Sequence, residues 1–181
     1  MKTFIIFMAF LVIFSSCLVF SEDSRNYVRL QEYLKALAEE CAAGGVLMKD
    51  ASSAADSYIV NTEDARLYAE FIAGEIQDEN SDSGTRESEP SALGRNFAVS
   101  LTPLRHGIVK VEKIMAASSM TDAEKTAYGL NDDASGHSYT SAEKLYVEVS
   151  WTANPGYRII RLPFLSSPDT VSQRAVYEVV K

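Results

Sequence analysis

The chain has 181 residues, of which 46% are apolar and 23% are charged, a composition typical of globular rather than disordered proteins. Without the first 21 residues about 160 remain, enough for one ordinary domain with a core of its own. The net charge of −8 argues against a nucleic-acid partner, because binding to phosphates requires a basic patch. The acidic balance fits a solvated surface that faces outward.

The first feature along the chain is an uncharged apolar segment from Phe4 to Ser21. As a helix, its 18 residues extend about 27 Å, near the lower limit for crossing a bilayer. Lys2 precedes the segment, and Glu22 and Asp23 follow it directly. This charge bias places the N-terminus in the cytoplasm and the rest of the chain outside.

Three fates of this segment are open. It can be retained as an anchor whose helix continues outward, or be cleaved as a signal peptide after Val19-Phe20-Ser21. A lipoprotein modified at Cys17 is the third, although Phe14 and the apolar residues after the cysteine are atypical of such a site. We expect a membrane-anchored protein with its domain outside the cytoplasm, with a secreted protein as the alternative.

Residues 24–49 have the periodicity of an amphipathic helix. One apolar stripe repeats at spacings of 3, 4, 3 and 4, and consists of Tyr27, Leu30, Leu34, Leu37 and Cys41. The opposite face is charged, and several alanines keep the stripe narrow, so that a neighbour can approach closely: Ala36, Ala38, Ala42 and Ala43. We predict that this helix stripe is the interaction surface of the protein.

No helix breaker separates the stripe from the apolar segment, so we expect one helix from the membrane to about residue 49, although Gly44-Gly45 weakens it there. On such a helix the 24 residues between Cys17 and Cys41 span roughly 36 Å. A disulfide needs Cα atoms within about 7 Å, so an intrachain bond is not expected.

A second helix is predicted over residues 62–77, capped by Asn61 or Thr62. One of its faces combines Ala65, Tyr68, Ile72 and Ile76. The polar residues after it, 78–95, are rich in serine and glutamate and are predicted to form a flexible acidic loop.

From residue 96 onward the pattern changes to the alternation of strands. Two short strands are predicted, one with alternating Phe97, Val99 and Leu101, and one in which Ile108 or Val109 alternates with Val111. A third strand is predicted over 145–151. Beyond a turn at Asn154-Pro155-Gly156, Tyr157–Leu165 is predicted to be its hairpin partner. Thr121 to Glu124 form a capping-box signature, residues 129–142 are loop-like, and 171–180 favour a final strand over a short helix.

The resulting fold class is α+β: a long N-terminal helix, apolar and then amphipathic, packed on a small antiparallel sheet. Four regions follow from this interpretation: a transmembrane or signal segment (1–21), an amphipathic helical region (22–77), the flexible acidic loop (78–95) and a β-rich domain (96–181).

Catalytic chemistry finds little support in the sequence. The two histidines, His106 and His137, lack a G-x-S-x-G context, and loop residues are the favoured interpretation of both. Asn131-x-Asp133-x-Ser135-Gly136 resembles the start of a calcium loop, but Ala142 stands where the bidentate glutamate belongs. We predict no catalytic residue, no cofactor, no metal and no nucleic-acid partner.

Two further groups of residues, one acidic and one aromatic, have both a functional and a structural interpretation. The acidic residues of 78–89 can pair as carboxylates, but a solvated face is the expected state in a loop without apolar surroundings. Trp151, Tyr157 and Phe164 flank the predicted hairpin and suit a ligand platform, although packing of the sheet on a helix uses the same residues.

The order of an apolar helix, an amphipathic alanine-rich stretch (25–50) and a sheet domain ending in RAVYEVV (174–180) resembles the TadE-like minor pilins and pseudopilins of tight-adherence (type IVc) pilus systems. In that family the arginine-containing start of the amphipathic stretch and its later small residues correspond to Arg25, Arg29, Ala36, Ala38, Ala42 and Ala43 here. The resemblance implies a pilin-like fold and other pilin-like subunits as partners through the N-terminal helix.

The leading hypothesis is therefore a structural, non-catalytic subunit or assembly factor of a surface pilus or secretion pseudopilus. Under it, Leu34→Asp abolishes assembly and leaves the sheet domain folded. The alternative is a secreted or lipid-anchored extracytoplasmic binding module that recognises its ligand with the 145–165 hairpin and the 129–140 loop. In that case the 24–49 helix should fold back onto the sheet rather than extend from the membrane.

Overall fold

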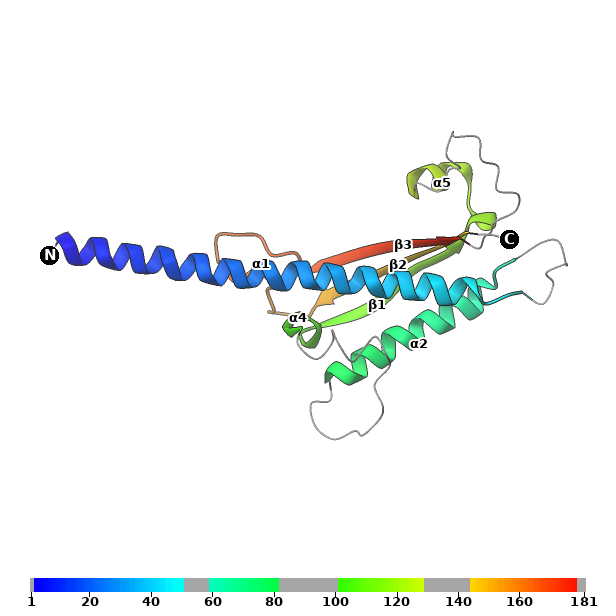
Figure 1. Cartoon of the computed structure of the whole chain (residues 1–181), viewed down its shortest axis with the longest axis horizontal. Helices are drawn as coiled ribbons and strands as arrows, with labels where there is room; N and C mark the ends of the chain where they lie inside the picture. Colours follow the sequence, from blue (N-terminus) through cyan, green and yellow to red (C-terminus); the bar gives the residue numbers. More distant parts are fainter. Residues whose placement is uncertain (1, 51–58, 82–100, 129–143, 179–181) are drawn as a thin grey trace.

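The structure is a computed structural model that describes residues 2–50, 59–81, 101–128 and 144–178. A long helix, α1, runs from Lys2 to Val46, and its C-terminal half lies along a three-stranded antiparallel sheet. Its N-terminal half projects beyond every other element, as Figure 1 shows. The predicted α+β arrangement of a long helix on a small sheet is confirmed.

Helix α1 is continuous across the boundary between its apolar and amphipathic parts. At 1.5 Å per residue, its 45 residues make a rod of about 67 Å. No proline interrupts it, and its glycines, Gly44 and Gly45, lie in the last turn, where a weak helix former costs little. The predicted single helix is confirmed, and it ends at Val46 rather than at residue 49.

The sheet has the order β1-β2-β3, with β2 (Lys144–Ala153) in the centre. Its neighbours are β1 (Gly107–Ala116) and β3 (Thr170–Glu178), and both pair with it in antiparallel fashion. The strands predicted around Val109, over 145–151 and near the C-terminus are confirmed. Leu145, Val147, Val149 and Trp151 point from β2 into the main core, which also contains the buried half of α1.

Strand β1 contains a β-bulge that changes which of its side chains face the core. Val111 pairs with Val149 and Lys113 pairs with Glu148, so that Glu112 is the extra residue of a bulge. Because one added residue shifts the alternation by one, Val109 and Val111 face the core before the bulge and Ile114 faces it afterwards. The ambiguity between Ile108 and Val109 is thereby resolved, since Val109 is buried and Ile108 is exposed.

The predicted return strand over Tyr157–Leu165 is wrong, because β2 pairs instead with β3, which begins at Thr170. The preceding turn is real: Tyr157 N donates to Asn154 O at 3.0 Å, and Gly156 has a φ of 86°, which glycine adopts without strain. Pro163 cannot donate to a strand ladder, and the segment crosses to α1 instead of to the sheet.

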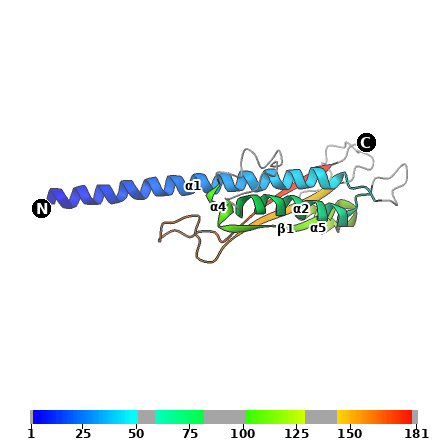
Figure 2. The same cartoon turned by 90° about the horizontal axis from the view of Figure 1, so that it is seen from below.

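Helix α2 (Thr62–Ser81) lies beside α1 and against β1, as the views in Figures 1 and 2 agree. Asn61 caps it, accepting from the backbone N–H groups of Glu63 and Asp64 at 3.1 and 3.3 Å. The helix runs further than residue 77 and includes residues 78–81, which were expected to be loop. Its buried line differs slightly from the predicted one and consists of Ala65, Ala69 and Ala73, with Tyr68 and Ile72 half-buried.

Alanines make the two helices approach closely. Ala38 and Ala42 of α1 are fully buried, and Cys41 Sγ lies 4.0 Å from the carbonyl oxygen of Ala69 on α2. A Cβ added at Gly45 would stand 3.2 Å from the Cβ of Ala65. At Cys41 and Gly45 the close neighbour of α1 is thus α2 of the same chain, whereas Ala36 is exposed.

Three short elements complete the described chain: α4 (Thr102–Arg105), η2 (Ala117–Ser119) and α5 (Asp122–Tyr128). Leu101 precedes α4 directly and does not end a strand. The capping box of α5 is confirmed, since Thr121 N donates to Glu124 Oε2 at 2.9 Å and Glu124 N donates to Thr121 Oγ1 at 3.3 Å. The backbone N–H of Thr121 and then its hydroxyl, which donates to Glu124 Oε2 at 2.8 Å, lower the pKa of the Glu124 carboxyl.

Several predictions lie outside the described residues. They are the strand residues Phe97 and Val99, the rest of the acidic loop (82–95), the calcium-like motif, His137 and the 129–142 loop. The side chain of Ile76 lies outside as well.

Candidate functional site

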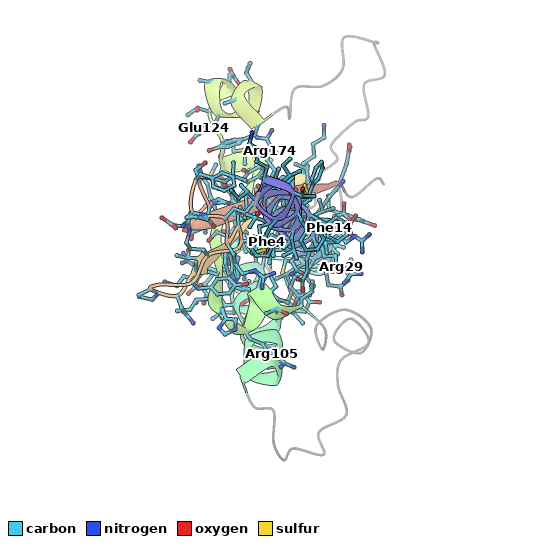
Figure 3. All side chains as sticks on the ribbon, turned by 90° about the vertical axis from the view of Figure 1, so that its left-hand side faces the viewer. Phe4, Phe14, Arg29, Arg105, Glu124 and Arg174 are labelled. Atoms are coloured by element: carbon cyan, nitrogen blue, oxygen red, sulfur yellow. The ribbon has the colours of Figure 1, made fainter. Side chains whose placement is uncertain are left out.

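The apolar half of α1 is the most distinctive surface of the molecule. Its large exposed side chains range from 43% exposed at Met8 to 69% at Phe10, and none of the apolar stretch is buried by the rest of the chain. Among the described residues, this is the one helix long and apolar enough to cross a membrane, a property that an N-terminal signal sequence shares. Figure 3 looks along this helix toward the sheet, with Phe4 and Phe14 lying in front of it.

The helix stripe that was predicted to bind partners lies in the core of this chain. Leu30, Leu34, Leu37 and Cys41 are fully buried against the sheet and α2, and Tyr27 packs beside them half-buried. The stripe therefore stabilises the domain. A partner that meets this half of α1 in the folded protein reaches its other face, where Val28, Arg29, Lys35 and Ala36 are exposed.

The two halves of α1 meet at a polar contact with the loop between β2 and β3. Asp23 is only 1% exposed, and its carboxylate accepts from the backbone N–H of Arg161 and from Arg161 Nε, both at 2.8 Å. Glu22 accepts from Arg161 Nη2 at 3.0 Å. Hydrogen bonds with Asp23 and then with Glu22 raise the pKa of the Arg161 guanidinium, so its charge is retained.

Arg161 is a residue that sequence reasoning missed. It stands 138 positions from Asp23 in a segment expected to be a strand, and no periodicity connects the two. The signal that was present is the pair of acidic residues directly after the apolar segment. Besides their effect on the orientation of the helix in a membrane, one of them requires a basic partner because it is buried.

The loop that carries Arg161 is braced internally. Arg158 Nη2 donates to the carbonyl oxygen of Leu165 at 2.6 Å, and Leu165 N donates to Leu162 O at 3.2 Å. The second bond closes a turn with Pro163 and Phe164 at its corner. Phe164 is 74% exposed, more than any other large apolar side chain whose burial the structure describes.

The residues considered for catalysis are dispersed. His106 is exposed and stacks on Tyr157 with ring centroids 4.7 Å apart, and no nucleophile or acidic partner accompanies it among its described contacts. The three aromatic residues considered as a ligand platform do not lie on one surface. Trp151 is fully buried, the ring of Tyr157 packs edge-on against that of Trp151, and Phe164 is exposed. Within the described ranges, no three or more His, Cys, Asp and Glu residues gather as metal ligands would.

The two cysteines differ sharply in environment. Both are free, with Cys17 exposed on the apolar half of α1 and Cys41 buried in the core. Burial, together with the nearby charge of Glu40, raises the pKa of the Cys41 thiol to about 12. Because the thiolate is the reactive form, Cys41 is inert in the folded protein, and Cys17 is the thiol available to reagents.

Comparisons of the chain with protein-family models, with curated proteins and with solved structures find no match.

Proposed function

We propose that the protein is a membrane-anchored, structural and non-catalytic subunit or assembly factor of a surface pilus or secretion pseudopilus, with its domain outside the cytoplasm. The observation that carries the proposal is the division of α1. One half is buried in its own domain, and the other half projects from it as a bare apolar rod. Such a rod needs lipid, or the apolar helices of other subunits, to cover it.

The resemblance of the sequence to TadE-like minor pilins supports the same function. Helices that leave the lipid together can cover one another's apolar surfaces, which gives a filament its core, while the sheet domains face water. The helix–sheet arrangement suits this use, because the domain is already folded on its own half of α1 before any partner arrives.

The secreted or lipid-anchored binding module remains the second candidate. It expects the 24–49 helix to fold back onto the sheet, but in α1 this part packs on the sheet and also continues the apolar segment without a break. The pilin-like fold shares the packing on the sheet, so the packing alone does not separate the two functions. The difference lies in residues 4–21, which a subunit keeps and a secreted module loses.

The test uses epitope-tagged full-length chain in the cell that produces it. The membrane fraction and the sheared surface fraction are each examined by intact mass and N-terminal sequencing. The proposal expects chain that retains Phe4 to Ser21 in both fractions. Chain that begins at Glu22, or that carries lipid on Cys17, contradicts it and favours the binding module.

A cysteine cross-link makes the test more specific. With a thiol oxidant, helices gathered side by side in the membrane should give disulfide-linked products through Cys17. Cys17→Ser should abolish these products, and Cys41→Ala should leave them unchanged because Cys41 is buried. Retained helix without any Cys17-dependent product, in membranes or in sheared filaments, counts against assembly through the apolar half.

A further inference from the structure

We propose that the turn Leu162–Leu165, with Phe164 at its corner, inserts into the lipid headgroup region next to the apolar helix and serves as a second membrane contact of the domain. The proposal rests on the retention of the anchor under the proposed function. The occupant it assigns to the exposed apolar turn is the bilayer surface itself.

The position of the turn along α1 is the first argument. Arg161, the residue before the turn, is tied to Asp23 and Glu22, which directly follow the apolar segment. If residues 4–21 span the bilayer, Asp23 lies at the level of the headgroups, and the hydrogen bonds of Arg161 place the turn at that level too. In Figure 1 the loop between β2 and β3 lies at the end of the sheet from which the apolar half of α1 projects.

The chemistry of the turn is the second argument. Pro163 and Phe164 are exposed, with Leu162 and Leu165 half-buried beside them, so the tip presents apolar surface to its surroundings. An aromatic side chain on a turn is stabilised at the boundary between headgroups and acyl chains, because its ring is removed from water there. The charge of Arg161 is balanced by Asp23 and Glu22, but the exposed guanidinium of Arg158 lies in the same loop and suits the phosphates of the headgroups.

The bracing of the loop is the third argument. The Arg158–Leu165 and Leu165–Leu162 hydrogen bonds fix the turn, and Ile160 N donates to Ser167 Oγ at 3.2 Å across its base. A turn held in this way presents Phe164 without further ordering, so little conformational entropy is lost on contact with lipid.

The experiment adds one tryptophan at a time to the full-length chain, which also contains Trp151, and reconstitutes each variant in vesicles of dibrominated phosphatidylcholine with a minority of phosphatidylglycerol. Bromine on the acyl chains quenches only tryptophans at or below the headgroup region. The variants are Phe164→Trp, Phe14→Trp as the marker of the anchor, and Leu47→Trp as the control. Leu47 is 71% exposed, close to the 74% of Phe164, but it directly follows the end of α1 that is far from the apolar segment. The unsubstituted chain, with the buried Trp151, gives the baseline.

The expected result is a loss of emission for F164W comparable with that of F14W, and no loss for L47W. Quenching of F14W without quenching of F164W overturns the membrane contact of the turn and leaves the anchor intact. It then favours a second protein as the cover of Phe164. Absence of quenching for F14W overturns the anchor, and with it both proposals. Because Phe164 is exposed, the substitution leaves the core untouched, and circular dichroism of each variant verifies the fold.

Discussion

The two halves of α1 share one secondary structure and differ in where their apolar surface is covered. Residues 23–46 place their apolar stripe against a sheet and a second helix of the same chain, and they mix it with charged residues on the outside. Residues 4–21 are uncharged, and their large apolar side chains are exposed. One helix therefore joins a part whose apolar surface is covered by its own chain to a part whose apolar surface is not.

The sharpest way to test this comparison is one substitution made in the buried half. Leu34→Asp places an unpaired carboxylate in a fully buried site, so we expect the domain to lose on the order of 4 kcal/mol of stability or to unfold. Denaturant unfolding of the chain in detergent measures the loss, and Leu47→Asp, on an exposed side chain near the end of the same helix, is the control.

For Leu34→Asp, the structure and the sequence alone lead to opposite expectations about the stability of the domain. From the sequence, Leu34→Asp was expected to abolish assembly and leave the sheet domain folded, because Leu34 was taken to face a partner. A domain that keeps its full unfolding midpoint with Asp at this position would mean that α1 does not pack on the sheet.

The corresponding substitution in the projecting half should act on the membrane alone. Phe14→Asp costs about 3 kcal/mol for insertion of the helix into a bilayer, while the unfolding midpoint of the domain stays unchanged. Carbonate extraction of membranes measures retention of the chain, with Val28→Asp on the exposed face of the other half as the control. Loss of domain stability with Phe14→Asp would contradict the independence of the two halves.

A third prediction concerns the contact between the halves. Asp23→Ala removes the acceptor of two hydrogen bonds from Arg161, one of them charge-assisted, so the loop should open more easily by about 2 kcal/mol. Limited trypsin digestion at Arg158 should then proceed at least tenfold faster, with little change in global unfolding. Glu22→Ala, which removes only the exposed pair at 3.0 Å, should change the rate slightly. Equal rates for the two variants would show that Asp23 does not hold the loop.

The smallest expected effects come from two glycines. A Cβ at Gly45 would stand 2.8 Å from Leu145 Cδ2 and 3.2 Å from Ala65 Cβ, whereas one at Gly74 on α2 has nothing within 4 Å. Gly45→Ala should therefore destabilise by about 1 kcal/mol, since overpacking outweighs the gain in helix propensity. Gly74→Ala should stabilise by up to about 1 kcal/mol. Thermal melting compares them, and stabilisation by both would mean that α1 and α2 are further apart than described.

Periodicity sufficed to predict the elements whose pattern was long and regular. The continuous α1, the helix capped by Asn61, the capping box at Thr121 and the alternating residues of β2 follow from local chemistry that tertiary contacts do not override. The bulge at Glu112 and the extension of α2 to Ser81 were missed, because each depends on a single residue or on a boundary without a strong stop signal.

The site was harder to predict than the fold. The stripe from Tyr27 to Cys41 was recognised as a packing surface, but an apolar stripe carries no information about whether its cover belongs to the same chain. The Tyr157–Leu165 segment was taken for a strand because its apolar content resembles one. Its actual role depends on Arg161 meeting Asp23, a contact between distant positions that local pattern cannot show.

The absence of a proline or an internal glycine between Lys2 and Gly44 has a mechanical consequence. A rod without a hinge transmits tilt and rotation, so the angle at which residues 4–21 lie in their surroundings sets the angle of the whole domain. A pull on the buried end of the rod loads the sheet directly, along the length of β2 and β3, with no flexible segment of α1 to absorb it. The domain and residues 4–21 therefore tilt and rotate together.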